Sequence, residues 1–280
     1  MSVKAELERH GLRARRSLGQ NFLADRGLCD KIASLVAPAP GSVLEIGAGL
    51  GALTAPLLAR GSHVVAVETD RSLASVLREK FASELAGGQL ELLEADAREL
   101  DLAAVLSRLP SPRTLAGNLP YHLSGLLLRR AVDLVGTCER AVFLLQLEVV
   151  ERLCAPAGAP DYGALSVFVQ SVYRPQRELV VRRGAFYPQP GVDSAIAVLE
   201  LREPRCAPPS ETFSRVVKSA FEKRRKTLRN AWRALELSPP ELERLAAEAQ
   251  IDLDARGETL PVSAFERMAA ALDAQLSRSP

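Results

Sequence analysis

Short apolar runs alternate with segments of helical periodicity along much of the chain. We interpret the runs as buried strands because they are rich in Val, Leu and Ile. Six runs of this kind are Ser42–Ile46, His63–Glu68, Leu90–Leu93, Thr114–Gly117, Arg140–Leu145 and Ala195–Leu201. Before and between them apolar residues recur three or four positions apart, as in Leu28, Ile32 and Leu35 after Asp25, a suitable helix cap. The alternation predicts an α/β fold with a parallel, doubly wound sheet.

The pattern changes near residue 204, where the proline-rich segment Pro204–Ser210 is typical of a linker. Before it, helices are expected at 123–135, 146–154 and 162–170, with an extended piece at 171–183. Beyond it the apolar spacing is helical throughout, with turn signals at 238–240 and at Gly257. We therefore expect two domains, residues 1–205 with an α/β sheet and residues 206–280, small and all helical.

The first predicted strand runs into the glycine-rich segment Gly47–Gly51, and a helix is expected to follow. Glycines let the backbone approach a ligand that lies over the N-terminus of such a helix. The spacing Gly-x-Gly-x-Gly, with Glu45 two residues upstream, differs from the Gly-x-Gly-x-x-Gly of dinucleotide-binding folds. It is usual in S-adenosylmethionine-dependent methyltransferases, although a plain tight turn is the alternative.

Two acidic residues follow the next predicted strands. Glu68 ends the second strand, about twenty residues after the glycine segment. A carboxylate at this place can accept hydrogen bonds from both hydroxyls of a ribose. Asp96 follows the third strand, where it can accept a hydrogen bond from an adenine amino group. The alternative for Glu68 is an acid that only starts the next helix.

The segment Asn118–Tyr121, Asn-Leu-Pro-Tyr, follows the fourth strand at the edge where open α/β sheets bind ligands. The Asn118 amide oxygen and the Leu119 main-chain carbonyl are two acceptors that suit the two N–H groups of an aromatic amine. Pro120 stiffens the turn without adding a donor, and Tyr121 offers a face for stacking a base. Phe186 is a candidate second aromatic wall. The alternative for Asn118–Tyr121 is an ordinary strand-to-helix turn, and the alternative for Phe186 is a phenylalanine of the core.

Charge is segregated, although the net charge of the 280 residues is only +2. Between Arg215 and Arg233 the single acid is Glu222, and eight residues are basic: Arg215, Lys218, Lys223, Arg224, Arg225, Lys226, Arg229 and Arg233. The N-terminal arm adds Lys4, Arg9, Arg13, Arg15 and Arg16. Such clustering is typical of a polyanion-binding surface, with an ordinary solvated face as the alternative.

Several protein classes are excluded by composition. No apolar run reaches the length of about 18–20 residues needed to span a membrane, and no signal peptide is expected. The four cysteines, Cys29, Cys138, Cys154 and Cys206, have no paired spacing. We expect reduced thiols in a cytoplasmic protein, with neither disulfides nor a metal site.

The motifs, taken in order, resemble one known family. They are Leu18–Leu23 (LGQNFL), Glu45–Gly51 (EIGAGLG), Asn118–Tyr121, Phe186–Pro190 (FYPQP) with Val192–Ser194 (VDS), and Arg224–Asn230 (RRKTLRN). As a set they are similar to the KsgA (RsmA) family of ribosomal RNA adenine dimethyltransferases, over about residues 12–235. Ala48 departs from the proline common in the family, and the last forty or so residues match weakly.

The resemblance implies a Rossmann-like catalytic domain that dimethylates two adjacent adenosines in a hairpin near the 3′ end of 16S ribosomal RNA. The methyl donor is S-adenosylmethionine, and the reaction is coupled to small-subunit biogenesis. Residues implied to contact the cofactor are Asn21, Leu23, Gly47, Gly49, Glu68, Asp96 and Asn118. Those implied for the target-base pocket are Asn118, Leu119, Pro120, Tyr121 and Phe186. Within the basic run we expect RNA contacts from Lys223, Arg224, Arg225, Lys226 and Arg229.

The expected partner is 16S ribosomal RNA within the 30S subunit or its precursor, bound by a monomer. The nearest alternative is the 23S ribosomal RNA dimethyltransferase of the antibiotic-resistance type; the segments 162–166 and 224–230 favour the small-subunit enzyme. A second is a ribosome-assembly binding factor whose methylation is incidental. A third, a nicotinamide-dependent dehydrogenase, would require the longer glycine spacing.

Overall fold

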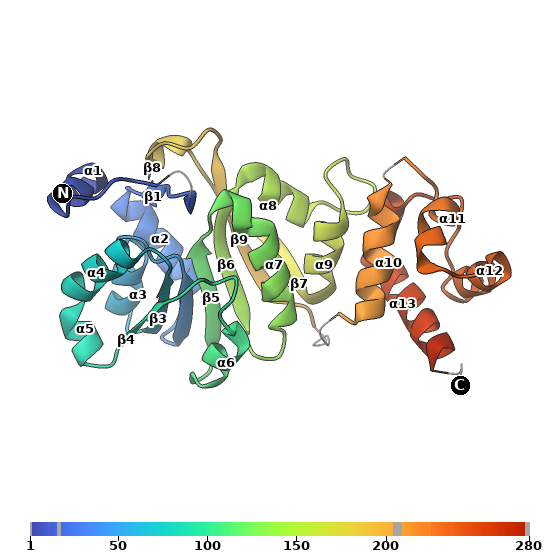
Figure 1. Ribbon diagram of the computed structural model, residues 1–280, viewed down its shortest axis with the longest axis horizontal. Coiled ribbons are helices and arrows are strands. Elements are labelled where there is room, and N and C mark those ends of the chain that lie inside the picture. Colours follow the sequence, from blue (N-terminus) through green and yellow to red (C-terminus); the bar gives the residue numbers. More distant parts are fainter. Residues whose placement is uncertain (1, 16–17, 204–208, 224, 278–280) are drawn as a thin grey trace. The chain divides into compact units, whose positions relative to one another are not determined.

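The computed structural model describes residues 2–15, 18–203, 209–223 and 225–277 (Figure 1). Its contacts divide the chain into two compact units, Met1–Val150 with Gln176–Leu201, and Glu151–Pro175 with Arg202–Pro280. The boundary expected at residue 205 differs from this division in residues 151–175, which belong to the second unit. The greater part of the predicted linker, residues 204–208, lies outside the described residues, as do Arg16, Cys206 and Arg224.

A seven-stranded sheet forms the centre of the first unit, in the order β4-β3-β2-β5-β6-β9-β7. The strands are β2 (Ser42–Ile46), β3 (His63–Glu68), β4 (Leu90–Glu94), β5 (Arg113–Asn118), β6 (Arg140–Gln146), β7 (Tyr173–Val181) and β9 (Ser194–Leu201). All five residues of β2 are buried. Burial of both strand faces is characteristic of a sheet covered by helices on both sides, so the predicted α/β class is confirmed.

The prediction of a wholly parallel sheet is wrong at β9. Strands β4, β3, β2, β5 and β6 are parallel, whereas β9 is antiparallel to β6. The first residue of β9, Ser194, pairs with the last residue of β6, Gln146. The chain therefore enters β9 at the edge where the parallel strands end and must run back along β6.

Helices cover this sheet. They are α2 (Arg26–Val36), α3 (Thr54–Ala59), α4 (Arg71–Lys80), α5 (Ala82–Ala86), α6 (Leu102–Ser107), α7 (Ser124–Asp133) and α8 (Leu147–Cys154), whose last residues enter the second unit. The predicted cap of α2 is confirmed, because the Asp25 side chain accepts a hydrogen bond from the Leu28 amide at 3.0 Å. Ile32 and Val36 of α2 then pack in one core cluster with Val43 and Val142 of the sheet.

The N-terminal arm packs onto the first unit through α1 (Val3–Arg9). Leu7 lies in a small apolar cluster with Leu50 of the glycine loop and Leu73 of α4. Lys80 Nζ also donates to the Glu6 carboxylate at 2.9 Å and to the Leu50 carbonyl at 2.7 Å. The arm is therefore attached to the loop expected to bind a nucleoside.

Two short strands that the sequence pattern did not indicate hold the end of this arm. Strand β1 (Phe22–Leu23) pairs antiparallel with β8 (Phe186–Tyr187), so that Leu23 lies opposite Phe186. A two-residue strand has no readable periodicity, which is why neither was predicted.

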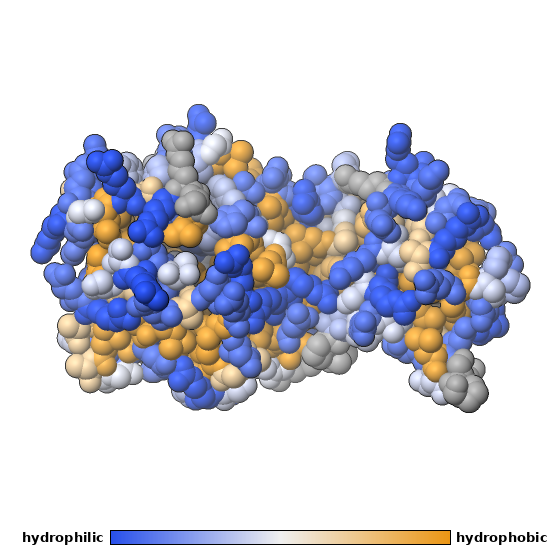
Figure 2. Space-filling model, in the orientation of Figure 1, coloured by the Kyte–Doolittle hydropathy of each residue, from blue (hydrophilic) through white to orange (hydrophobic). Residues whose placement is uncertain are grey.

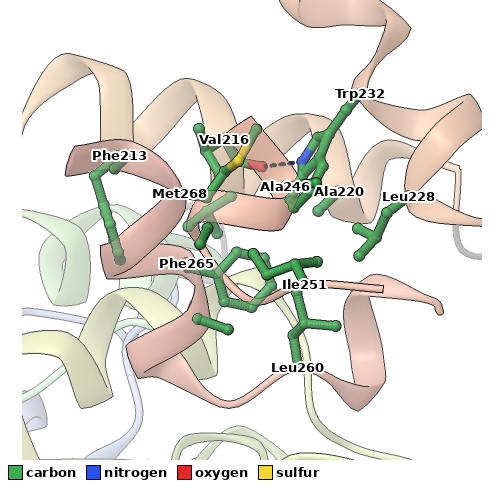
Figure 3. Packing of buried hydrophobic residues seen from close by; sticks show 14 of the residues in the cluster. Phe213, Val216, Ala220, Leu228, Trp232, Ala246, Ile251, Leu260, Phe265 and Met268 are labelled. Atoms are coloured by element: carbon green, nitrogen blue, oxygen red, sulfur yellow. Dashed lines mark hydrogen bonds between the residues drawn. The ribbon is translucent and has the colours of Figure 1, made fainter. Parts of the chain in front are cut away.

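The second unit is helical in its C-terminal part, as expected. Its helices are α9 (Ala164–Val172), α10 (Glu211–Glu222), α11 (Leu228–Ala231), α12 (Pro239–Glu248) and α13 (Val262–Leu276), with short 3₁₀ turns η4 (Trp232–Leu235) and η5 (Gly257–Thr259). Figure 3 shows Ile251 and Leu260 around the ring of Phe265. The buried indole of Trp232 donates to the Val216 carbonyl at 3.0 Å. Because α9 contributes to this core, residues 151–175 group with the helical unit.

Figure 2 shows a face on which hydrophilic residues predominate, with smaller hydrophobic areas between them. Within the described ranges, the structure contains no helix with the length and apolar character needed to cross a membrane.

Candidate active site

A cavity of about 790 Å³, including its open mouth, lies at the carboxyl ends of β2, β3 and β5. It is lined by segment 18–22 of the arm, the glycine loop, the ends of β3 and β4, and the Asn118–Tyr121 turn. The chain moves outward from β2 through β3 to β4 and then returns to the other side of β2 for β5. Open α/β sheets bind ligands at such a point of reversal.

The glycine loop places Gly47 and Gly49 in the lining of this cavity. Gly49 has φ +60, a left-handed conformation that favours glycine, and its N–H donates to Glu68 Oε2 at 2.8 Å. Gly51 is also left-handed, and a Cβ there would lie 2.4 Å from the Phe81 ring. The third glycine of the motif is thus required for packing, whereas the second brings backbone to the cavity.

Glu68 lies at the cavity wall, as the sequence predicts, and is only 5% exposed. Its carboxylate accepts hydrogen bonds from the amides of Gly49 and Asp70, the latter at 2.9 Å. Burial raises the pKa of Glu68, and the two backbone bonds oppose that change. A carboxylate has about four acceptor positions, so Glu68 keeps acceptor capacity for a ligand hydroxyl.

Asp96 also lines the cavity, but its carboxylate is engaged by Arg98, a residue that sequence reasoning missed. Arg98 Nη2 lies 2.6 Å from Asp96 Oδ2, and its Nε contacts both carboxylate oxygens. These hydrogen bonds lower the pKa of Asp96. A ligand amine would therefore share a charged carboxylate with this guanidinium.

The Asn118–Tyr121 turn brings its first side chain to the arm. Asn118 Nδ2 donates to the Asn21 carbonyl at 2.8 Å, and the Asn21 side chain donates to the Gly19 carbonyl at 3.3 Å. The amide group of Asn118 is thereby oriented, because its donor side faces the arm and its oxygen must face away. In the part of the chain that the structure describes, no hydrogen bond reaches this oxygen. Two residues predicted separately, Asn21 and Asn118, thus form one unit.

Leu119 and Tyr121 are fixed by hydrogen bonds to residues outside the Asn118–Tyr121 turn. The Leu119 side chain is buried, and its amide donates to the Leu144 carbonyl at 3.2 Å. Tyr121 begins the short turn η2 (Tyr121–Leu123), and its carbonyl accepts a hydrogen bond from Ser124 Oγ at 2.8 Å. The Tyr121 hydroxyl lies 2.9 Å from Ser194 Oγ, and burial raises its pKa. Ser124 carried no signal in the sequence, and Ser194 was noted only as part of the VDS motif, without a contact to this turn.

The main cavity is not lined by Phe186 or Leu23, for which the resemblance implies roles at the site, although Leu23 lines a smaller adjoining hollow. Phe186 is 5% exposed, belongs to the core cluster under the sheet, and is not among the residues lining the main cavity. Leu23 belongs to the same cluster and also lies outside that lining. Pairing of β1 with β8 turns both side chains into the core. Phe22, whose ring does line the cavity, was not predicted as a site residue.

Glu45 lies behind the glycine loop in a smaller hollow that adjoins the main cavity. It is 2% exposed, and Thr54 Oγ1 donates to its carboxyl group at 2.6 Å. Burial raises the pKa of Glu45 to about 8. Glu45 is therefore largely protonated at neutral pH, and its hydrogen bond with Thr54 stabilises the start of α3.

The predicted RNA-binding residues belong to the second unit. Lys223, Arg225 and Lys226 are exposed, and the Lys226 amide donates to the Lys223 carbonyl at 2.8 Å in a turn after α10. Arg229 differs from them. Its guanidinium lies 2.9 Å from Glu243 and 3.4 Å from Asp254, and these contacts raise its pKa.

Taken together, the described residues form a cradle for a nucleoside-like ligand beside a turn with two acceptor oxygens. The two features share Asn118, which lines the cavity and carries one of those oxygens. Such an arrangement suits transfer of a group from a bound cofactor to an amine held at the turn.

Comparison with known proteins identifies relatives over almost the whole chain. The model of a family described as ribosomal RNA adenine dimethylase matches residues 11–273. The chain is 46% identical to ribosomal RNA small subunit methyltransferase A of Anaeromyxobacter dehalogenans, over 98% of each chain. It is 42% identical to the protein of the same name in Geobacter metallireducens, over 94% of this chain and 96% of that one.

Two solved structures share the fold. A dimethyladenosine transferase from Plasmodium falciparum superposes with a TM-score of 0.73 at 23% identity, over 91% of this chain and 98% of that one. The 23S rRNA methyltransferase ErmE superposes with a TM-score of 0.64 at 26% identity, over 90% of this chain and all of that one.

Proposed function

The chain belongs to the ribosomal RNA adenine dimethylase family, and we propose that it dimethylates two adjacent adenosines in a hairpin near the 3′ end of 16S ribosomal RNA. The donor is S-adenosylmethionine, and the reaction accompanies assembly of the small subunit in the cytoplasm. The observation that carries the proposal is the hydrogen bond from Asn118 to Asn21, which sets the orientation of an amide at the cavity wall.

The cavity residues fit S-adenosylmethionine, which when bound supplies a methyl group on a positively charged sulfur. The glycine loop leaves room for close approach of a ligand to the backbone. Glu68 retains acceptor capacity for the ribose hydroxyls, and Asp96 for the adenine amino group. Asn21 and Asn118 close the cavity on the side of the turn. We assign cofactor binding to these residues.

At the turn, the Asn118 amide oxygen and the Leu119 carbonyl accept the two N–H groups of the target amine. An adenine amine is a weak nucleophile because its lone pair is delocalised into the ring. Holding both protons favours a pyramidal nitrogen, and the turn then fixes the direction of its lone pair. Tyr121 stacks on the flipped base and offsets part of the cost of leaving the helix. The chain therefore needs no general base with a strongly shifted pKa.

RNA contacts come from the exposed cations that follow α10. Among the residues that the structure describes, Lys223, Arg225 and Lys226 form no ion pair, and we assign them to phosphate contacts. We assign to Arg229 a structural part, because two carboxylates already hold it. The enzyme acts as a monomer on the 30S subunit or its precursor.

The proposal is tested by transfer of tritiated methyl groups to ribosomal subunits that lack the modification. Undermethylated 30S and 50S subunits are incubated separately with the protein and labelled S-adenosylmethionine, and labelled nucleotides are mapped. We expect label on two neighbouring adenosines of 16S ribosomal RNA. Label on 50S subunits alone would instead identify an enzyme of the 23S type, and 30S binding without any label would favour an assembly factor.

A further inference from the structure

Ser194 is a completely buried serine, with 0% exposure, whose hydroxyl contacts the proposed base-binding turn. Its Oγ and the Tyr121 hydroxyl share a hydrogen bond of 2.9 Å. Ser194 does not line the cofactor cavity, whereas Tyr121 does. The first residue of β9 therefore contacts a side chain of the cavity wall without lining the cavity itself.

The backbone around Ser194 is fixed by three contacts of its neighbour Asp193. The Asp193 carbonyl accepts from the Leu147 amide at 3.0 Å. Its carboxylate accepts from the Arg183 amide at 2.9 Å and from the Arg182 guanidinium at 2.7 Å. The Arg183 amide and the arginine side chains hold the pKa of Asp193 low, so this carboxylate stays charged at neutral pH. These contacts fix the backbone from which the Ser194 side chain extends.

Tyr121 is held at its backbone and at its side-chain hydroxyl. Its main-chain carbonyl accepts from Ser124 Oγ, and its hydroxyl meets Ser194. Half-buried tyrosine hydroxyls normally have a hydrogen-bond partner, and this bond fixes the position of the hydroxyl end and so limits the tilt of the ring. A base that stacks on the ring inherits that orientation.

We propose that Ser194 is a positioning residue for methyl transfer: through the Tyr121 hydroxyl it sets the plane on which the target base stacks. This inference rests on the function proposed above. Stacking on Tyr121 gives the base its contact area. The hydrogen bond to Ser194 sets the direction of the Tyr121 ring relative to the two acceptor oxygens of the turn. A misoriented base would hold its amine off the line of transfer, which lowers the rate more than the affinity.

Two single variants remove the same hydrogen bond from opposite ends. We expect Ser194→Ala and Tyr121→Phe each to lower the methyl-transfer rate by about tenfold, the size of one lost hydrogen bond. The KM for S-adenosylmethionine should not change in Ser194→Ala, because this residue does not line the cavity. If Ser194 acts through the Tyr121 hydroxyl, the double variant should be no slower than Tyr121→Phe alone.

The experiment measures single-turnover transfer of tritiated methyl groups to undermethylated 30S subunits by the wild type and the three variants. Ser42→Ala is the matched control: Ser42 is also buried and first in its strand, at the opposite edge of the sheet, and its hydroxyl has no partner among the described residues. This control should retain the wild-type rate.

Each outcome is decisive for one of the two proposals. A Ser194→Ala rate equal to that of Ser42→Ala would overturn the positioning role, and so would losses that multiply in the double variant. Should Ser194→Ala fail to fold, Tyr121→Phe with an unchanged rate would overturn it equally. A wild-type chain that labels no ribosomal RNA would overturn the proposed function and this inference with it.

Discussion

The buried carboxyl group of Glu45 makes the stability of the first unit depend on pH. Burial raises the pKa of Glu45 in the folded chain to about 8, from 4.5 for an unperturbed glutamate. Between these values the unfolded chain releases the proton and the folded chain keeps it. Rising pH therefore favours unfolding across this window, by about 1.4 kcal/mol per pH unit. From pH 6 to pH 7.5 the loss amounts to about 2 kcal/mol, and the full window to about 5 kcal/mol.

Glu45→Gln should remove this dependence while keeping the shape of the side chain. The amide oxygen of glutamine can still accept the hydrogen bond that Thr54 Oγ1 donates at 2.6 Å. The variant should therefore be more stable than the wild type at pH 7.5, and the gain should be about 2 kcal/mol smaller at pH 6. Urea unfolding followed by circular dichroism at the two pH values measures the difference.

The difference between the wild type and Glu45→Gln isolates Glu45, because every other ionisable residue is present in both proteins. Glu99→Gln, which neutralises an exposed glutamate, is the control and should follow the wild-type pH dependence. Parallel pH profiles for the wild type and Glu45→Gln would refute the reasoning, since they would mean that Glu45 is already ionised in the folded chain.

Four further variants, one of them a double variant, test the site and the RNA surface. Asn118→Ala should abolish methyl transfer while weakening cofactor binding by calorimetry only about tenfold; wild-type turnover would contradict the role of the turn. Gly51→Ala should lower the free energy of unfolding by about 1–3 kcal/mol, because the new Cβ overlaps a core phenylalanine ring; a variant as stable as the wild type in urea would count against that packing. Replacing Arg225 and Lys226 with alanine should flatten the salt dependence of 30S binding, whereas Arg229→Ala should leave the slope alone and destabilise the helical unit. Equal slopes in the double variant and the wild type would rule out the phosphate contacts.

Much of the fold could be predicted from local patterns. Strand β3 begins and ends as the apolar run His63–Glu68 does, and β2 likewise matches Ser42–Ile46. Asp25 caps α2 as its residue type predicts. These features depend on hydrogen bonding and burial of residues near in sequence, so the sequence carries their signal directly.

The direction of β9 and the pairing of β1 with β8 could not be predicted in this way. Both depend on where the chain lies after long excursions, and neither leaves a local period. The same holds for Phe186, whose place in the core follows from its pairing with Leu23 rather than from its motif.

The same distinction between local pattern and distant contact applies to the candidate site. Sequence alone determined which chemical groups are available: the glycine loop, the acid at Glu68 and the amide and carbonyl of the Asn118–Tyr121 turn. Only the tertiary structure decided their states, because those depend on partners distant in sequence. Asn21 orients Asn118, Arg98 engages Asp96, Ser194 holds Tyr121, and burial keeps a proton on Glu45. Hydrogen bonds and desolvation act across space, so the residue types were readable from the chain, whereas their orientation and charge required the fold.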